Sequence, residues 1–266
     1  MFYTLKCYIV SMENLHLIYY SPALSTKNII CAAAKQIPLP IIEHDITQGI
    51  KEPIALSKAD FAVFASPVFA GRIPAMAADI FKTIKGKNTP AVIMVVYGNR
   101  DYDDALLELK DISSKNGFLP VSAGAFIARH SIFTKVAEQR PDNSDINKIT
   151  EFIKKSFTLA QNGNITKELK VKGNTPYKTP GKIPLKPSGT YKCNKCGVCV
   201  AACPVKAIPA DNPKKTDKEK CFSCARCIAL CPQHARKFKG ILFKIAAIGF
   251  AKKVKLRKEP ETFFIN

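Results

Sequence analysis

The sequence has few acidic residues, no long apolar run and no dinucleotide fingerprint. Its 21 Asp and Glu stand against 41 Lys and Arg, which gives a formal net charge of +20. No apolar run is long enough to span a bilayer, which argues against an integral membrane protein. No Gly-x-Gly-x-x-Gly motif occurs, so direct use of a nicotinamide dinucleotide is not expected.

The first eleven residues are apolar but have neither a basic leader nor a cleavage site. They therefore do not resemble a secretory signal. Two interpretations of residues 1–11 stay open: an additional edge strand, or an artefact of the choice of start site. Met12 lies just before the first convincing strand.

A duplicated cysteine pattern is the strongest feature that the sequence does have. Eight of its ten cysteines fall into two copies of C-x2-C-x2-C-x3-C-P, from Cys193 to Pro204 and from Cys221 to Pro232. This is the spacing of a bacterial-type ferredoxin that holds two [4Fe-4S] clusters. The two prolines lack a backbone N–H and suit an abrupt change of chain direction.

The spacing also predicts which cysteines share a cluster. Each iron corner of a cubane takes one soft thiolate. Three cysteines at i, i+3 and i+6 can reach three corners of one cube, whereas the fourth lies further along and completes the other cube. One cluster is assigned to Cys193, Cys196, Cys199 and Cys231. The other is assigned to Cys203, Cys221, Cys224 and Cys227.

Structural zinc and a disulfide framework are the alternatives for these cysteines. Zinc usually takes four ligands from two well-separated C-x2-C pairs, and disulfides are expected mainly in small secreted chains. Neither matches eight cysteines in a duplicated triplet-plus-one pattern. Free thiolate ligands also favour a reducing compartment, so we expect a cytoplasmic protein.

The positive charge is concentrated in the C-terminal part of the chain. Residues 1–160 have 18 basic and 15 acidic side chains, whereas residues 161–266 have 23 and 6. Two oxidised clusters would lower the net charge of this part by about four, and it would stay strongly positive. Such a field attracts acidic proteins, so we expect an acidic redox partner. No nucleic acid is expected, because the lysines are scattered and lack an aromatic stacking platform.

Short apolar runs alternate with helical patterns over residues 12–160. Periodicity predicts strands at 15–20, 40–46, 61–65, 91–96 and 118–128. It predicts helices at 26–36, from about 75, at 103–114 and at 146–159. This alternation is typical of an α/β domain with a five-stranded parallel sheet covered on both faces. Ligands of such sheets bind beyond the carboxyl ends of the strands, where this chain has the turns 21–26, 66–74 and 97–103.

Several of these turns carry a resemblance to a known family. The matching segments are Tyr20–Thr26, Ser66–Pro74 and Tyr97–Leu106, and residues 124–126, 130–131 and 257–261 also fit. Residues 12–160 resemble flavodoxin, and nearly the whole chain is similar to the flavodoxin–ferredoxin fusion proteins of anaerobic microbes. The resemblance implies a flavodoxin-like domain followed by a small α+β ferredoxin domain of the bacterial 2[4Fe-4S] type.

The same resemblance implies FMN as the cofactor of the first domain. Its phosphate would bind at Ser21, Ala23, Leu24, Ser25 and Thr26. Its ring would lie between two loops, one made by Ser66, Pro67, Val68, Phe69, Ala70 and Gly71 and one by Tyr97, Gly98, Asn99 and Tyr102. Tyr97 or Tyr102 is then the candidate to stack on the ring.

One departure from the flavodoxin pattern concerns the phosphate loop. Flavodoxins usually have a glycine where this chain has Leu24, and leucine adopts a positive φ only with strain. Pro22 also offers no N–H donor. The domain therefore either binds FMN through the hydroxyls of Ser21, Ser25 and Thr26 or keeps an emptied flavodoxin fold.

The expected organisation has four parts. These are the flavodoxin-like domain (12–160), a linker (161–190), the ferredoxin domain (191–238) and a C-terminal helix and tail (239–266). The linker is rich in Lys, Gly and Pro, which favours a semi-extended segment that separates the domains. The helix, at 240–254, is predicted to be amphipathic and basic. It either covers the ferredoxin or the domain junction, or contacts an anionic membrane surface.

Together these features predict an electron-transfer protein that passes electrons between two [4Fe-4S] clusters and FMN. Two alternatives stay open: an FMN-dependent oxidoreductase with an unidentified substrate, and a two-cluster ferredoxin with a non-binding flavodoxin-like docking domain. For the oxidoreductase, Tyr102, Asp103 and His130 are the acid–base candidates. In addition, the cations Lys195, Lys206 and Arg226 are expected to raise the cluster potentials.

Overall fold

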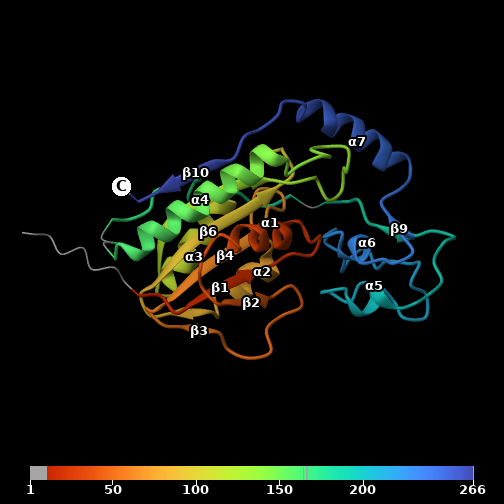
Figure 1. Ribbon diagram of the computed structural model, residues 1–266. Helices are drawn as coiled ribbons and strands as arrows, with labels where there is room; N and C mark the ends of the chain where they lie inside the picture. Colours follow the sequence, from red (N-terminus) through yellow and green to blue (C-terminus); the bar gives the residue numbers. More distant parts are fainter. Residues whose placement is uncertain (1–10, 164, 166, 182, 266) are drawn as a thin grey trace, which may run out of the picture.

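The computed structural model describes residues 11–163, 165, 167–181 and 183–265. Its largest element is a six-stranded sheet with the order β2-β1-β4-β6-β7-β10. The strands are β1 (Asn14–Tyr19), β2 (Ile41–Asp45), β4 (Asp60–Pro67), β6 (Thr89–Tyr97), β7 (Phe118–Ile127) and β10 (Glu261–Phe264). The cysteine-rich segment lies at one end of this sheet (Figure 1). The expectation of an edge strand at residues 1–11 falls almost wholly outside the described residues.

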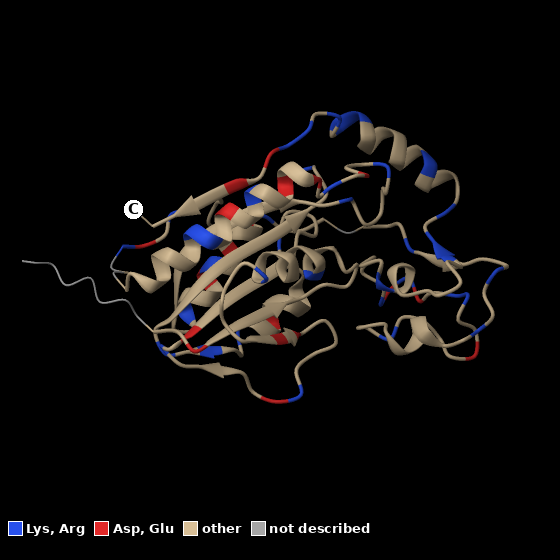
Figure 2. Ribbon diagram, in the orientation of Figure 1, with Lys and Arg blue, Asp and Glu red and all other residues tan. Residues whose placement is uncertain are grey.

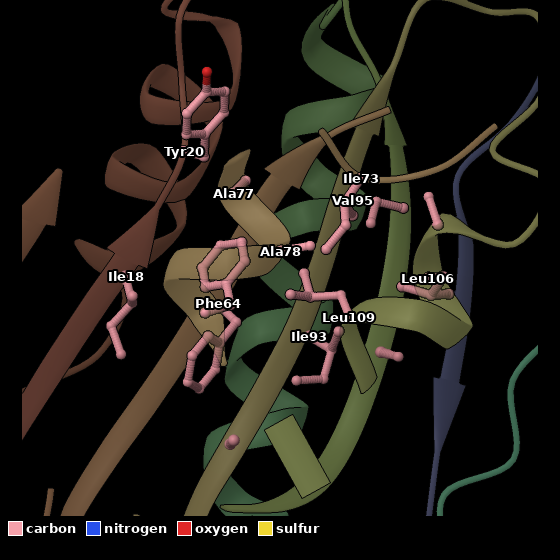
Figure 3. Close-up of a cluster of buried hydrophobic side chains, with 14 of the residues drawn as sticks. Ile18, Tyr20, Phe64, Ile73, Ala77, Ala78, Ile93, Val95, Leu106 and Leu109 are labelled. Atoms are coloured by element: carbon pink, nitrogen blue, oxygen red, sulfur yellow. The ribbon is translucent and has the colours of Figure 1, made fainter. Parts of the chain in front are cut away.

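The central strands β4 and β6 are buried along their whole length. A parallel strand covered on both faces needs apolar side chains in both directions, so its sequence is a continuous apolar run. The side chains of these two strands alternate between two cores. Phe64 and Ile93 belong to one core, part of which is drawn in Figure 3, whereas Val63 and Met94 belong to the other.

Four helices cover the two faces of the sheet. Helices α1 (Ser25–Ala34) and α4 (Asn143–Gln161) pack on one face, and α2 (Ala75–Phe81) and α3 (Ala105–Lys115) pack on the other. Counted among the five parallel strands alone, the order is 2-1-3-4-5, which is that of a flavodoxin-like sheet. The predicted α/β fold with five parallel strands is confirmed. A short parallel ladder joins β3 (Ala55–Leu56) to β5 (Lys85–Gly86).

The C-terminal segment, expected as a helix and tail, also forms the sixth strand, β10. It pairs antiparallel with β7, with Glu261 opposite Ala125 and Phe264 opposite Ser122. Its two phenylalanines face opposite cores: Phe263 packs on one and Phe264 on the other. The tail therefore caps the free edge of β7 and completes the first domain. Unpaired edges invite association with other chains, and a covered edge does not.

The linker also differs from the expectation, because it packs on the flavodoxin-like domain. The side chain of Leu169 is buried in one of the two cores. Tyr177 donates its hydroxyl to Asp111 Oδ2 at 2.6 Å, and the backbone N–H of Lys178 donates to Asp104 Oδ2 at 2.6 Å. These side-chain contacts hold the segment against α3. It therefore acts as a strap rather than a free spacer.

The ferredoxin-type segment is small and internally repeated. It contains α5 (Val198–Ala201), α6 (Arg226–Ala229) and a two-stranded antiparallel ladder of β8 (Ser188–Gly189) and β9 (Arg236–Lys237). A direct hydrogen bond joins it to the first domain, from Gln48 Nε2 to the carbonyl of Ala201 at 2.9 Å.

Helix α7 (Ile241–Lys253) runs along the outer edge of the molecule and connects the two domains (Figure 1). Phe243 and Phe250 pack against Phe133, with ring centroids 5.8 and 4.7 Å apart. The helix thus lies over the domain junction, where we placed it as one alternative. Among the described residues, no helix combines the length and the apolar character that crossing a membrane requires.

Candidate iron–sulfur and flavin sites

The eight cysteines of the duplicated pattern surround two separate cavities. One cavity is lined by Cys193, Cys196, Cys199 and Cys231. The other is lined by Cys203, Cys221, Cys224 and Cys227. The fourth cysteine of each copy thus lies with the first three of the other copy, which is the grouping predicted from the spacing. Among the described residues, no three His, Cys, Asp or Glu side chains are placed to hold a single metal ion.

The two cysteine loops have the same backbone conformation. Two positions in each loop have positive φ: Lys195 and Gly197 in the first, and Ser223 and Ala225 in the second. These residues stand at the same offsets from Cys193 and from Cys221. The left-handed turns wind each loop tightly, and the short helices α5 and α6 begin directly after them. Three thiols of each loop are thereby brought to one cavity.

The fourth cysteine of each copy also has a repeated environment. The backbone N–H of Ala207 donates to Cys203 Sγ at 3.2 Å, and that of Ala235 donates to Cys231 Sγ at 3.2 Å. An N–H directed at sulfur stabilises a thiolate and, through it, the reduced state of a cluster. Burial raises the pKa of the Cys224 thiol to about 12. The thiolate at this position therefore needs compensation from a bound cation such as cluster iron.

Two buried arginines support the fit of an anionic cluster to each cavity. Arg226 lines the cavity of Cys224 and is 8% exposed, whereas Arg236 lines the cavity of Cys199 and is 2% exposed. Nε of both residues and Nη1 of Arg226 have no hydrogen-bond partner among the described residues. The partners of Arg236 among the described residues are neutral acceptors, such as the Pro187 carbonyl and the Thr216 hydroxyl, and not a carboxylate. A buried cation without an anion is strongly unfavourable, and a four-thiolate cubane carries net negative charge.

A third pocket lies at the carboxyl ends of the parallel strands. It gathers much of the predicted flavin site: Ala23, Ser25, Thr26, Pro67, Val68, Phe69, Ala70, Tyr97 and Gly98. The loop 128–132, which follows β7, lines it as well, together with Ile183 from the linker and Ser223 from the cysteine-rich segment. The carboxyl-end rule could have identified the loop 128–132, because β7 is a parallel strand of the same sheet.

The phosphate end of this pocket is the N-terminus of α1. Leu24 is the N-cap, with φ of 67° in the left-handed region, and its side chain does not cap the helix; Ser21 Oγ accepts from the first-turn N–H of Lys27 alone. The chain thus adopts with leucine the conformation that glycine would allow freely, at a strain of about 1–2 kcal/mol. The hydroxyl of Thr26 is buried and has no partner among the described residues. Uncapped N–H groups beside an unpaired hydroxyl fit a phosphate.

Ser21 has a different role from the one predicted. Its hydroxyl accepts a hydrogen bond from the backbone N–H of Lys27 at 2.9 Å, and its own N–H donates to Thr47 Oγ1 at 2.9 Å. The side chain therefore braces the loop from within and does not line the pocket. Ser66, Leu24 and Gly71 are likewise absent from the pocket lining.

Two further predicted residues at the ring end hold the C-terminal segment instead. Tyr102 donates its hydroxyl to Glu261 at 3.0 Å and packs edge-on against Tyr97, so it is not available to stack on a flavin. Asn99 donates to the carbonyls of Val254 and Leu256, both at 2.9 Å. Local sequence patterns do not show these contacts, because both join residues more than 150 positions apart. Tyr97 remains at the pocket.

His130 is a neutral side chain in the wall of the flavin pocket. Burial, with a further contribution from the charge of Arg100, lowers the pKa of His130 to about 4. Its Nδ1 accepts hydrogen bonds from the N–H groups of Ile132 at 3.1 Å and Phe133 at 3.0 Å. Nδ1 is therefore unprotonated, and the single ring proton lies on Nε2.

The pocket and one cysteine cavity are immediate neighbours. Ser223 lines the flavin pocket. In the chain it lies between Cys221 and Cys224, which both line one cysteine cavity. The preceding residue, Phe222, packs its ring 6.0 Å from that of Phe69 in the second flavin loop. We call the cavity of Cys203, Cys221, Cys224 and Cys227 the inner cavity, and the other one the outer cavity.

The strand order and the cysteine cavities together define a two-part protein, in which a domain with a flavodoxin-like sheet is joined to a small segment with two four-cysteine cavities. Residues 192–235 match the family described as a 4Fe-4S dicluster domain. The chain thus combines a flavodoxin-like sheet with a segment that matches a 4Fe-4S dicluster domain. The comparison with curated proteins found no match.

Solved structures similar to the chain cover its N-terminal part. A Fusobacterium nucleatum flavodoxin bound to flavin mononucleotide is 13% identical, covers 54% of this chain and 96% of its own, and has a TM-score of 0.40. A Streptococcus pneumoniae TIGR4 flavodoxin is 12% identical, with 55% and 98% covered and a TM-score of 0.41. An oxidoreductase from Corynebacterium diphtheriae is 12% identical, with 59% and 99% covered and a TM-score of 0.43.

Proposed function

We propose that the protein is an electron carrier that relays electrons between two [4Fe-4S] clusters and FMN. The observation that supports this most directly is the adjacency of three sites: an outer cysteine cavity, an inner cysteine cavity and the pocket at the sheet edge. Each cysteine cavity has the four thiols that one cubane needs. The pocket has the helix N-terminus and the hydroxyl that a flavin phosphate needs.

Each group has a defined task in this relay. The eight cysteines hold the clusters, and the N–H donors of Ala207 and Ala235 with the buried guanidinia set their potentials. FMN, when bound, exchanges one or two electrons and so links one-electron carriers to two-electron donors. Ser223 lines the flavin pocket and Phe222 lines the inner cavity, which would bring the inner cluster close to the ring.

The positions of the three sites indicate the order in which electrons would pass between them. The inner cavity adjoins the flavin pocket, because Phe222 lines the cavity and the next residue, Ser223, lines the pocket, whereas no residue of the outer cavity is a chain neighbour of a pocket residue. An external partner would therefore exchange electrons at the outer cluster, and the inner cluster would pass them to or from FMN. Lys and Arg dominate the ferredoxin half (Figure 2). We propose an acidic redox protein as that partner, because this field raises its encounter rate.

The enclosure of the flavin pocket favours this relay over an FMN-dependent oxidoreductase. Ile183 of the strap and Ser223 of the ferredoxin segment contribute to its walls. A substrate would have to displace them to reach the ring. The neutral His130 could donate a proton from Nε2, but its low pKa makes it a weak acid–base partner near neutral pH.

Cofactor analysis of anaerobically purified protein tests the proposal. We expect about eight iron and eight sulfide per chain and about one FMN. Cys193→Ser should weaken the outer cluster and Cys203→Ser the inner cluster, each removing up to about four iron while the other cluster stays visible by electron paramagnetic resonance. Zinc in place of iron would overturn the relay. Eight iron without flavin would leave a two-cluster ferredoxin and contradict the FMN assignment.

A further inference from the structure

Helix α7 has a second apolar face that is turned away from the protein, so it is apolar on two sides and not amphipathic as predicted. Its aromatic side chains Phe243 and Phe250 already seat it against Phe133. Four aliphatic side chains are nevertheless exposed: Ile241 (77%), Leu242 (78%), Ile245 (64%) and Ile248 (61%). At 100° per residue, three of them fall within about 60° of one another and Leu242 lies beside them. They form an aliphatic stripe on the outer side of the helix.

Positive charge surrounds this aliphatic stripe. Lys244 flanks it, and the exposed Lys252 and Lys253 follow at its C-terminal end. The whole stretch 220–258 has eleven Lys and Arg and no Asp or Glu. Figure 2 shows the helix and the segment after it as a basic outer edge of the molecule.

We propose that the aliphatic stripe of α7 lies on an anionic membrane surface, with its lysines at the lipid headgroups. A short helix with an aliphatic face and flanking lysines is the form that lies in the plane of a membrane interface. Each lysine near an anionic leaflet adds a favourable electrostatic contribution. The helix is at the periphery and runs along the surface (Figure 1), so a flat bilayer can reach it without contact with the sheet.

Two other occupants fit the same surface less well. A second copy of this chain would bring lysine against lysine around the stripe, which is unfavourable. A protein partner would be expected to meet aromatic or arginine anchors at the centre of the contact, since these residues dominate interface energetics. The centre of this stripe has only isoleucine and leucine.

Vesicle flotation of the full-length holo-protein tests this proposal. The vesicles are pure phosphatidylcholine or phosphatidylcholine with 30% phosphatidylglycerol, at low and high salt. We expect binding to the anionic vesicles that is at least tenfold stronger than to the neutral ones and weaker at high salt. Ile245→Ser with Ile248→Ser should reduce binding at least tenfold, and Lys252→Gln with Lys253→Gln should reduce both binding and its salt dependence.

Matched control variants remove the same types of exposed side chain from the first domain. Ile41→Ser with Ile42→Ser removes two exposed isoleucines from β2, and Lys35→Gln with Lys58→Gln removes two exposed lysines from the first domain. Both control variants should bind like the wild type. Cluster absorbance in the visible range reports that every variant retains its folded ferredoxin domain.

Three results would overturn the proposal. One is equal binding to neutral and anionic vesicles, and another is binding that survives the Ile245→Ser, Ile248→Ser change. The third is a dimer, seen by light scattering without lipid, that the same variant dissociates, because the stripe would then belong to a second copy. None of these readouts depends on whether FMN is bound, so the proposed relay can fail without this inference failing.

Discussion

Arg236 illustrates how a single buried residue can act on both clusters. It is 2% exposed, and its Nη2 donates to the carbonyl of Pro187 at 3.2 Å. Its positive charge also favours the thiolate form of Cys199 at the outer cavity and of Cys227 at the inner one. A cation held between two clusters stabilises the reduced state of each, because reduction adds negative charge.

Arg236→Met, which keeps the length of the side chain but not its charge, should lower both cluster potentials. Removing one positive charge beside a cluster changes the free energy of its reduction by about 1–3 kcal/mol. This corresponds to a reduction potential that is lower by about 40–130 mV. Redox titration followed by electron paramagnetic resonance measures it. Arg236→Lys should restore most of the potential, and Lys237→Gln, at an exposed neighbour, should leave it unchanged. Fully loaded clusters with wild-type potentials in Arg236→Met would contradict this role.

Thr26 gives a test of the flavin phosphate site. Thr26→Val removes a buried hydroxyl that has no partner among the described residues, so it should not lower the stability of the flavin-free protein. It should weaken FMN binding about tenfold, because one hydrogen bond to the phosphate is lost. Fluorescence titration with FMN measures the affinity. Ser21→Ala, which removes a bond to the Lys27 N–H inside the loop, should mainly lower stability. Equal affinities for wild type and Thr26→Val would exclude this phosphate position.

The lowered pKa of His130 predicts how the stability of the folded protein depends on pH. Its folded pKa is about 4, below the ordinary value of 6.5, so below pH 6.5 the unfolded chain binds the proton more readily than the folded one. Stability is therefore fully present above pH 6.5 and declines toward pH 4. His130→Gln keeps a hydrogen-bond acceptor but does not titrate. The loss of unfolding free energy between neutral pH and pH 5 should therefore be smaller in this variant by about 1–2 kcal/mol. Thermal unfolding of both proteins between pH 7.5 and 5 gives the comparison, and parallel curves would refute it.

At the scale of elements, β10 closes the sheet although it is the last segment of the chain. Phe264 packs its ring 5.6 Å from Phe152, and the Lys155 ammonium lies 4.1 Å from the Phe264 ring centroid. Tyr102 and Glu261 join the same strand to the loop after β6. The first domain of this fusion therefore depends on residues that follow the second.

Phe264→Ala should destabilise the first domain through this strand. The side chain is only partly buried, so we expect a loss of about 1–3 kcal/mol and a Tm lower by several degrees. The clusters should still assemble, because their cavities lie in the ferredoxin segment. Differential scanning calorimetry under anaerobic conditions measures the shift. Thr262→Ala, at the exposed residue of the same strand, is the control, and an equal effect of both changes would argue against packing by Phe264.

The five parallel strands were predictable because short, largely apolar runs alternate with helical patterns. The runs of β4 and β6 are the clearest, whereas β2 is polar over its last three residues. β10 was not predictable, because four residues beside charged side chains give little periodicity. The strap was not predictable either, since Asp104 and Asp111 show in the sequence only as polar residues of a helical region. The sequence predicts which loops approach the flavin, but it could not show that Tyr102 and Asn99 are already bound to the tail.

At the scale of the whole molecule, the ferredoxin half is docked on the first domain at the carboxyl ends of the parallel strands. The cysteine grouping was predictable, because spacing along the chain fixes which thiols can reach one cube. The docking depends on contacts between distant segments, such as Phe69 with Phe222 and the apolar cluster of Ala23, Ile132 and Ala225. Local patterns do not show such contacts. In the proposed relay, these contacts join the two domains into one path.

Anaerobic stopped-flow reduction of the holo-protein tests the relay most directly. A one-electron reductant is mixed with the protein, and cluster bleaching and flavin absorbance are followed separately. We predict that flavin reduction follows cluster reduction with a first-order rate that does not change with protein concentration, and that Cys203→Ser, which disrupts the inner cluster, abolishes this phase. Flavin reduction that instead scales with the concentration of the reductant, and is the same in Cys203→Ser, would contradict an internal path from cluster to flavin.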